Sequence, residues 1–257
     1  MTPDDGQPAQ EGKRRRKRGK DTRPRWKILL MDWLRPLFIA LLILTPIRSS
    51  IADWNDVPSG SMKPSILVGD RIFVNKLAYG LRFPLTRHWI TRWDEPKPGD
   101  IVICYNPNTN QRLVKRVVAV GGDIIEVRRG DLFINGERPT YFDLDKNDLR
   151  GLSPDELAMS SFYAETLAGE RPGSVPHNVM RTPLIRRLFG PPDTPLLRVP
   201  HGSVYVMGDN REQSSDSRVF GVISVDRVVG QVGRVVVSVD PENYFLPRGD
   251  RFFKSLP

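Results

Sequence analysis

The sequence predicts a mainly β fold, in which an antiparallel β-sheet domain carries an inserted subdomain and follows one N-terminal transmembrane helix. Three observations lead to this class. The 257 residues include 23 prolines and 21 glycines, which divide the chain into short segments and favour strands over long helices. Most of these segments are rich in Val and Ile. Only one segment, close to the N-terminus, is apolar over a length near that of a membrane span.

The composition excludes several classes of site. Cys104 is the only cysteine, so an internal disulfide and a cysteine-based zinc site are both ruled out. The three histidines, His88, His177 and His201, have no metal-ligand spacing. No glycine-rich phosphate-binding loop is present. We therefore expect neither a metal nor an organic cofactor.

The first 25 residues form a basic head that we expect to be disordered and cytoplasmic. Residues 1–27 hold ten Lys or Arg against four acids, which is most of the chain's net charge of +9. Such a head could bind nucleic acid or an anionic membrane surface. The apolar segment directly after it favours the lipid bilayer, and no nucleic-acid partner is expected.

Residues 26–48 are expected to form a single membrane anchor. The uncharged core from Pro36 to Ile47 has only 12 residues, but extension back to Ile28 approaches the roughly 20 that a span requires. Asp32 and Arg35 must then lie near the interface. The basic head predicts a cytoplasmic N-terminus and an exported remainder. A buried helix and a cleavable signal peptide are the alternatives.

The β-rich domain is expected in two parts, 49–139 and 201–257. We predict a short tether before Val57, an irregular excursion or extended hairpin at 81–94, and a tight turn at Asn135-Gly136. Residues 140–200 are polar and rich in proline, so they are interpreted as an inserted subdomain with one short helix at 154–168. Strands are expected around Ile72 and Val74 and at 101–105, 113–120, 124–127, 132–134, 203–207, 222–223 and 228–239.

The stretch Ser59-Gly60-Ser61, between Pro58 and Pro64, is the strongest candidate for chemistry. Gly60 permits backbone angles closed to other residues, and the prolines stiffen the chain on both sides. Such a loop can expose a serine with its backbone N–H and a second hydroxyl nearby, as a nucleophile with an oxyanion site requires. The alternative is an ordinary surface turn that leads into a strand.

A serine nucleophile needs a base, and Lys115 is the candidate because it lies within the apolar strand at 113–120. There it either faces solvent or occupies an apolar site that lowers its pKa, in which case a neutral amine could deprotonate a serine. The polar loop 208–218 is the third element. In it, Asp216 and Arg218 could form an ion pair, and Ser214 could orient a lysine amine.

Together these stretches resemble the bacterial type I signal peptidases, membrane-bound Ser-Lys serine proteases that remove signal (leader) peptides. The resemblance rests on four segments in the family's order, and it does not include the basic head or residues 140–200. The segments are Pro58-Ser59-Gly60-Ser61-Met62-Lys63-Pro64 with Gly69-Asp70, Gly99-Asp100-Ile101-Val102, Lys115-Arg116-Val117-Val118 through Gly122-Asp123, and Gly208-Asp209-Asn210-Arg211 through Ser214, Asp216, Ser217, Arg218 and Gly221.

The resemblance implies a role for each matching position. Ser61 would be the nucleophile and Lys115 the general base, with the Ser61 N–H and the Ser59 hydroxyl as the oxyanion hole. Ser214 would bind the Lys115 amine, while Asp216 and Arg218 would support the site. Substrate-binding positions would be Val57, Met62, Ile66, Ile72, Leu113 and Val114.

The implied substrates are exported pre-proteins with Ala-x-Ala cleavage sites, and protein-export machinery is a further candidate partner. The enzyme would reside in the cytoplasmic membrane as a single-pass protein with an extracytoplasmic catalytic domain. The chain departs from the family in the turn Ala119-Val120-Gly121-Gly122-Asp123, in Glu212-Gln213 and in Phe220. These departures concern loop geometry.

Three other functions compete with this one. A specialised processing peptidase of a conjugation or secretion system would share every catalytic residue. A nucleic-acid-binding protein, or a self-cleaving Ser-Lys repressor, would need a recognition helix that the sequence lacks. A penicillin-binding enzyme needs Ser-x-x-Lys, whereas Ser61 and Lys63 are two residues apart.

Overall fold

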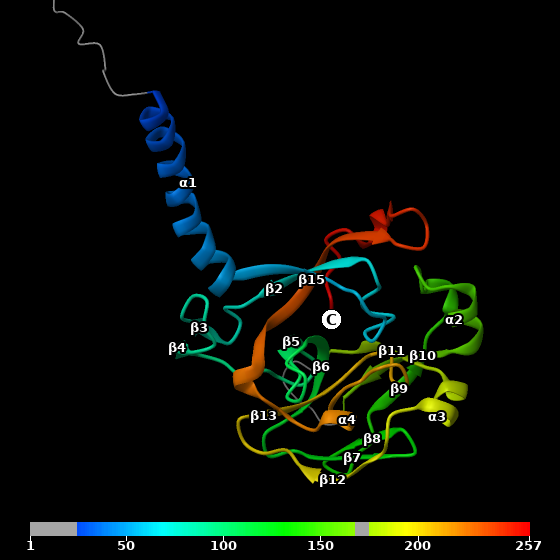
Figure 1. The fold of residues 1–257 in the computed structure, drawn as a ribbon. Helices are drawn as coiled ribbons and strands as arrows, with labels where there is room; N and C mark the ends of the chain where they lie inside the picture. Colours follow the sequence, from blue (N-terminus) through cyan, green and yellow to red (C-terminus); the bar gives the residue numbers. More distant parts are fainter. Residues whose placement is uncertain (1–24, 168–174) are drawn as a thin grey trace, which may run out of the picture. The chain divides into compact units, whose positions relative to one another are not determined.

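The computed structural model describes residues 25–167 and 175–257 (Figure 1). The expected disordered head lies almost entirely outside these residues. The chain divides into two units, residues 1–43 and 44–257. The first contains most of helix α1 (Arg25–Ser50), which confirms the helix expected at 26–48. Its segment Trp33–Ser50 has a mean hydropathy of 1.2, and among the described residues α1 alone is long and apolar enough to cross a membrane.

The second unit is built on an eight-stranded antiparallel sheet. The strand order is β1-β2-β15-β5-β6-β13-β14, and β16 pairs with β15. This arrangement confirms the predicted mainly β, antiparallel class. The strands are β1 (Ala52–Asp56), β2 (Asp70–Asn75), β5 (Ile101–Tyr105), β6 (Arg112–Val120), β13 (Ser203–Met207), β14 (Ile223–Ser224), β15 (Val228–Asp240) and β16 (Leu246–Pro247).

The pattern of apolar residues explains how these strands pack. In β2, Asp70, Ile72 and Val74 are buried and alternate with exposed residues, as expected of a strand with one face on the core. In β5, Ile101–Cys104 are all buried, because both faces of this central strand are covered. Ile72 pairs with Asn55 of β1 on one side and with Val235 of β15 on the other.

Three smaller sheets complete the fold. Strands β3 (Gly80–Arg82) and β4 (Trp89–Arg92) form a hairpin, which confirms the hairpin alternative for 81–94. Strands β7 (Ile124–Arg128) and β8 (Asp131–Ile134) form a sheet with β12 (Thr194–Arg198), and β10 (Ser161–Thr166) lies between β9 (Thr140–Asp143) and β11 (His177–Arg181). The short helices are α2 (Pro154–Met159), α3 (Pro183–Phe189), α4 (Ser217–Phe220), η1 (Lys146–Asp148), η2 (Val225–Arg227) and η3 (Gly249–Arg251).

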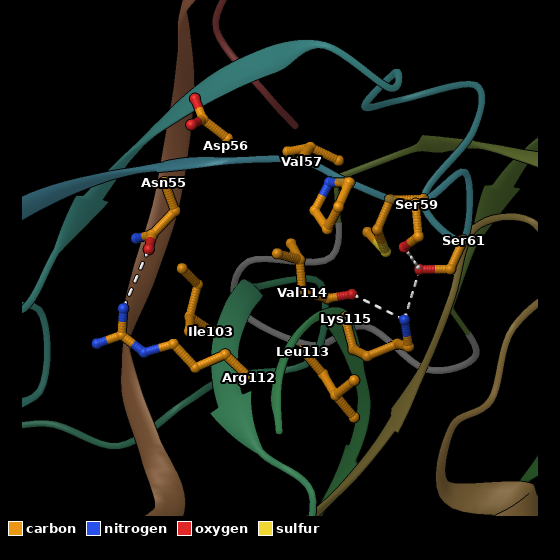
Figure 2. Close-up of a pocket in the computed structure, with 12 residues that line it drawn as sticks. Asn55, Asp56, Val57, Ser59, Ser61, Ile103, Arg112, Leu113, Val114 and Lys115 are labelled. Carbon is orange, nitrogen blue, oxygen red and sulfur yellow. Dashed lines mark hydrogen bonds between the residues drawn. The ribbon is translucent and has the colours of Figure 1, made fainter. Parts of the chain in front are cut away.

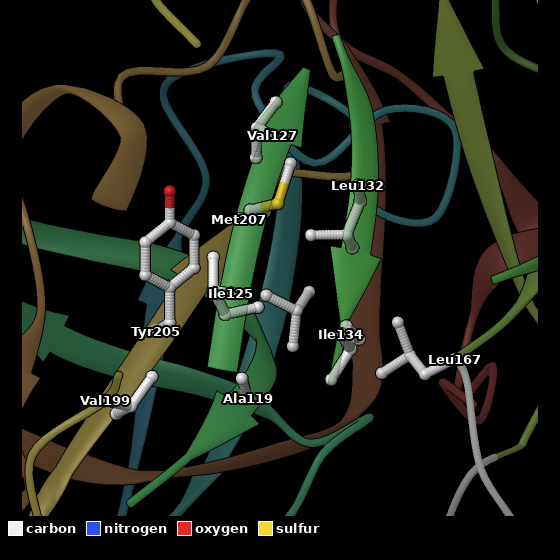
Figure 3. Close-up of a cluster of buried hydrophobic side chains, with 10 residues drawn as sticks. Ala119, Ile125, Val127, Leu132, Ile134, Leu167, Val199, Tyr205 and Met207 are labelled. Carbon is white, nitrogen blue, oxygen red and sulfur yellow. The ribbon is translucent and has the colours of Figure 1, made fainter. Parts of the chain in front are cut away.

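Buried hydrophobic clusters pack against the strands of the sheets. Figure 3 shows one of them, in which Ile125 and Val127 of β7 and Leu132 of β8 pack near Tyr205 and Met207 of β13. A second cluster, described below, lies behind the loop that carries Ser61. The predicted turn at Asn135-Gly136 is present: both residues have positive φ, and Ile134 pairs with Glu137 across it.

Two predictions of local structure were wrong. The expected tether before Val57 is strand β1, because the edge of β2 offers it a complete set of backbone partners. The helix expected at 154–168 ends at Met159 and is followed by β10. The capping box of Ser153 and Glu156 starts that helix, but the sequence Ser161–Thr166 is rich in aromatic and β-forming residues and pairs with β9 and β11.

Candidate active site

The loop that carries Ser61 connects β1 to β2 and is closed by short backbone hydrogen bonds. Val57 N–H donates to Asp70 O (3.0 Å), and Gly69 N–H donates to Val57 O (3.2 Å). Gly69 has φ of 88°, and a Cβ there would lie 2.2 Å from the backbone oxygen of Val239, so only glycine fits. The buried Asp70 carboxylate accepts from Leu67 N–H (2.8 Å) and Arg251 (2.6 Å).

The Lys115 amine lies against the Ser61 hydroxyl. Lys115 Nζ donates to Ser61 Oγ (2.6 Å) and to Val114 O (3.0 Å), as Figure 2 shows. The two residues are 54 positions apart, and the curvature of the sheet brings the β1–β2 loop over the start of β6. The structure thus brings together the serine and lysine that spacing alone could not pair.

The surroundings of Lys115 favour its neutral form. The residue is only 2% exposed, and burial lowers the pKa of its amine well below the usual 10.5. The carboxylates of Asp216 and Asp209 oppose this effect, but each is paired with an arginine. Within the described part of the chain the amine forms no ion pair with a carboxylate, so burial sets the direction of the shift and favours the neutral form.

Two buried ion pairs hold the polar loop 208–218 beside the amine. Asp216 accepts from Arg218 Nε (2.8 Å) and Nη2 (2.7 Å), and it also accepts from Gly208 N–H (3.1 Å). Arg116 of β6 binds both oxygens of Asp209 at 2.9 Å. For each carboxyl, burial raises the pKa, but the neighbouring arginine outweighs burial and holds the pKa below its usual range. Both carboxyls are therefore ionised at neutral pH.

Ser214 is buried in this loop close to the Ser-Lys pair. A Cβ on Gly208 would lie 2.3 Å from Ser214 Oγ and 2.4 Å from Ser61 O, so Gly208 separates the two serines at close range. The hydrogen bonds of the Lys115 amine go to Ser61 and Val114 rather than to Ser214.

The expected oxyanion donors lie beside the Ser61 hydroxyl. Ser59 Oγ is 3.5 Å from Ser61 Oγ. Within the described part of the chain, the Ser61 backbone N–H donates no hydrogen bond, so it remains available to a ligand. A hydroxyl and a backbone N–H next to a nucleophile are the donor types that stabilise a developing oxyanion.

A pocket of about 170 Å³ opens at Ser61 and Lys115 (Figure 2). Of the six expected substrate-binding residues, Val57, Met62, Leu113 and Val114 line it. Ile66 and Ile72 do not; they are fully buried in the hydrophobic cluster behind the loop, packed with Val57 and Met62. The small apolar pocket suits a small side chain.

Comparison with known proteins identifies the family. A model described as "Signal peptidase, peptidase S26" matches residues 30–237. The chain belongs to the signal peptidase family. It is 32% identical over 236 residues to a signal peptidase I of Pseudomonas fluorescens, across 87% of this chain and 78% of that protein. A signal peptidase IB of Staphylococcus aureus is 29% identical over 203 residues, across 79% of this chain and 87% of that protein.

A solved signal peptidase I from Enterococcus faecalis V583 is 27% identical, covering 54% of this chain and 97% of that structure with a TM-score of 0.31. As a member of the signal peptidase family, this chain is a serine endopeptidase that cleaves signal peptides from exported precursor proteins. Family membership favours this function over the nucleic-acid-binding and repressor alternatives.

Sequence reasoning missed several residues at this candidate site. Ile103 of β5 and Arg112 of β6 line the pocket, and the guanidinium of Arg112 donates to Asn55 Oδ1 (3.1 Å). The pairing of β5 with β6 could have indicated Ile103, because it stands opposite Val114. Asn210 also contacts the Ser61 loop. No cluster of metal-ligating side chains occurs in the described part of the chain.

Proposed function

We propose that Ser61 is the nucleophile of this signal peptidase and that Lys115 is its general base. The observation that carries the proposal is the 2.6 Å contact between Lys115 Nζ and Ser61 Oγ, made by an amine whose pKa burial lowers. When the amine is neutral, the same contact has the serine hydroxyl donating to nitrogen. This is the geometry that a general base requires.

The reaction then proceeds through an acyl-enzyme. Ser61 Oγ attacks the carbonyl carbon before the cleaved bond while its proton passes to Lys115. The Ser61 N–H and the Ser59 hydroxyl donate to the resulting oxyanion. The protonated Lys115 gives its proton to the nitrogen of the leaving peptide, which departs and leaves an ester on Ser61. Neutral Lys115 then takes a proton from a water molecule whose oxygen attacks the ester carbon, and it returns that proton to Ser61 Oγ as the acid product leaves.

The substrate binds as an extended strand beside the pocket. Among the described residues, β1 pairs only with β2, and the pairing of β13 with β6 begins at Arg116, so Leu113–Lys115 have one free edge. Residues from both edges line the pocket, so a peptide can form backbone hydrogen bonds there. The pocket's size suits alanine, consistent with Ala-x-Ala cleavage sites. Supporting roles for Asp216 and Arg218 follow from their buried ion pair, and Ser214 is proposed to bind the amine during turnover.

The enzyme is anchored in the cytoplasmic membrane by α1. Support comes from the apolar segment Trp33–Ser50 and from the basic head before it, which favours a cytoplasmic N-terminus and an extracytoplasmic catalytic domain. Such an anchor restricts the search for membrane-bound signal peptides to two dimensions. Protein-export machinery is a candidate partner. A specialised peptidase of a conjugation or secretion system shares this site and differs only in substrate range.

The test is cleavage of a pre-protein that carries an Ala-x-Ala site by the full chain in detergent. Ser61→Ala and Lys115→Met are compared with the exposed controls Ser215→Ala and Lys97→Met. The proposal expects both controls to cut after the last alanine and both active-site variants to be inactive. Activity in either active-site variant would refute the assignment. Cleavage of a dedicated substrate alone would identify the specialised peptidase.

A further inference from the structure

An oxyanion hole that uses the Ser61 N–H needs something to fix the direction of that bond. Ser61 N–H and Gly60 C=O belong to the same peptide unit, and in a planar trans peptide they point in opposite directions. Glycine has no Cβ to restrict its backbone, so Gly60 alone does not fix this plane. Whatever holds the Gly60 oxygen therefore also aims the Ser61 N–H.

Asn210 binds this peptide unit from outside the loop. Its side-chain Nδ2 donates to Gly60 O (3.2 Å), and its backbone N–H donates to Ser61 O (3.1 Å). Within the loop, Lys63 N–H also donates to Gly60 O (3.1 Å). Both the Gly60 and the Ser61 carbonyl oxygens thus accept a hydrogen bond from Asn210. Among the described residues, no other donor from outside the loop binds either oxygen.

The oxygen of the Asn210 side-chain amide accepts no hydrogen bond from the described residues in this orientation. Asn210 is 1% exposed, and its Oδ1 is buried without a hydrogen-bond partner among the described residues. A rotated amide would place Oδ1 against Gly60 O, which can only accept. The contact with Gly60 O therefore sets the amide orientation, and it does so at the cost of an unsatisfied acceptor.

Strand β11, from the inserted segment 140–200, holds Asn210 in place. Asn210 forms an isolated parallel bridge with Met180. Met180 N–H donates to Asp209 O (2.9 Å), and Arg211 N–H donates to Met180 O (3.0 Å), so the backbone is fixed on both sides of Asn210. Arg211 in turn pairs with the buried Glu165 of β10.

We propose that Asn210 is a positioning residue for the oxyanion hole: its amide fixes the Gly60–Ser61 peptide plane so that the Ser61 N–H points into the pocket. The inserted segment has a role in this arrangement, because β11 braces Asn210 against the nucleophile loop. The inference rests on the proposed roles of Ser61 and Lys115. It concerns transition-state binding and leaves the Ser-Lys proton transfer unchanged.

The experiment uses the full chain and measures kcat, KM and the affinity for a peptide aldehyde. The tetrahedral adduct that the aldehyde forms with Ser61 carries an oxyanion. Asn210→Ala removes the donor, and Asn210→Leu removes it while keeping nearly the same side-chain volume. Asn243→Ala, on an exposed loop, is the control. We expect kcat to fall by about 10- to 1000-fold, the upper figure being that for loss of a whole oxyanion donor. Aldehyde affinity should fall in parallel, with KM and the pH profile unchanged.

A kcat within about twofold of wild type in a folded Asn210→Leu variant would overturn the inference. So would an equal loss accompanied by a raised KM or a shifted pH profile, because that pattern indicates general distortion of the site. If Asn210→Ala is unstable, Asn210→Leu decides the question, since it leaves no cavity and no unpartnered oxygen. Inactivity of Ser61→Ala and Lys115→Met is measured in parallel, so that failure of the Ser-Lys assignment is recognised separately.

Discussion

Replacement of Asp216 by Asn should destabilise the fold because it removes the charge partner of a buried arginine. The side chains of Asp216 and Arg218 are 0% and 1% exposed. Breaking such a pair by removing one partner typically costs about 3–5 kcal/mol, since the remaining charge stays buried. Arg218 keeps one other acceptor, the backbone oxygen of Arg211 at 2.5 Å. We therefore expect a loss of roughly 3 kcal/mol, at the lower end of that range.

The assay is thermal unfolding of the full chain in detergent, followed by tryptophan fluorescence. For a domain of this size, about 1 kcal/mol shifts Tm by roughly 2–4 °C, so we expect a decrease of roughly 6–12 °C. The control is Glu126→Gln, which breaks an ion pair whose Arg128 side chain is 62% exposed. That pair should contribute less than about 1 kcal/mol.

The effect of Asp216→Asn should also depend on pH. Arg218 holds the folded-state pKa of Asp216 below the usual 3.8 despite burial, which acts to raise it. The carboxylate therefore contributes its stability above pH 3.8, and this contribution is lost as the pH falls toward the lowered folded value. The difference in Tm between wild type and variant should shrink in acid. A Tm decrease no larger than that of Glu126→Gln at neutral pH would refute the reasoning.

Three further outcomes are expected. Gly208→Ala should lower kcat at least tenfold, because its Cβ would lie 2.4 Å from Ser61 O; steady-state kinetics measure this, and wild-type kcat would contradict it. Lys115→Met should be more stable than wild type at neutral pH, because only the wild-type fold must bury an amine of lowered pKa. This gain in stability should disappear as the pH rises to 10.5, where the amine is also neutral in the unfolded chain. Tm measured against pH checks this, and a difference in Tm that does not change with pH would contradict it. Leu113→Trp should fill the pocket and raise KM for Ala-x-Ala substrates by about tenfold or more; an unchanged KM would remove Leu113 from the substrate site.

Most strands could be predicted because their apolar residues follow a simple pattern. The segments at 101–105 and 203–207 coincide with β5 and β13, since buried strands bounded by turns are recognisable from sequence. The order of the strands could not be predicted in this way. β15 lies between β2 and β5, and pairing between distant segments is decided by the packing of the whole sheet.

Residues 140–200, which we interpreted as an insertion, were the least predictable part. Their helix starts at the expected residue but was extended too far, because Ser153 and Glu156 signal where a helix starts, while nothing local signals that β10 will pair with β9 and β11. The burial of His177 beside Glu165 was missed for the same reason, since the two residues meet only when β10 pairs with β11.

For the active site, the sequence indicated which residues could carry the chemistry, and the fold determined which of them meet. Ser61 and Lys115 were candidates from their local contexts, but their contact depends on the curled sheet. Ile66 and Ile72 have the apolar character of pocket residues, yet the direction of each side chain places them in the core. Asn210 lies in a segment that the sequence singled out, but its contact could not be predicted, because the partner is a backbone oxygen 150 residues away.

The proposed proton transfer from Ser61 to a neutral Lys115 is tested most directly by the pH dependence of kcat with a peptide substrate. Because burial lowers the pKa of Lys115 below the usual 10.5, kcat should rise as the pH increases through that lowered value and then level off before pH 10.5. The Lys97→Met control should give the same profile as wild type. A kcat independent of pH across the neutral and alkaline range, or one that still rises at pH 10.5, would contradict a neutral Lys115 as the base.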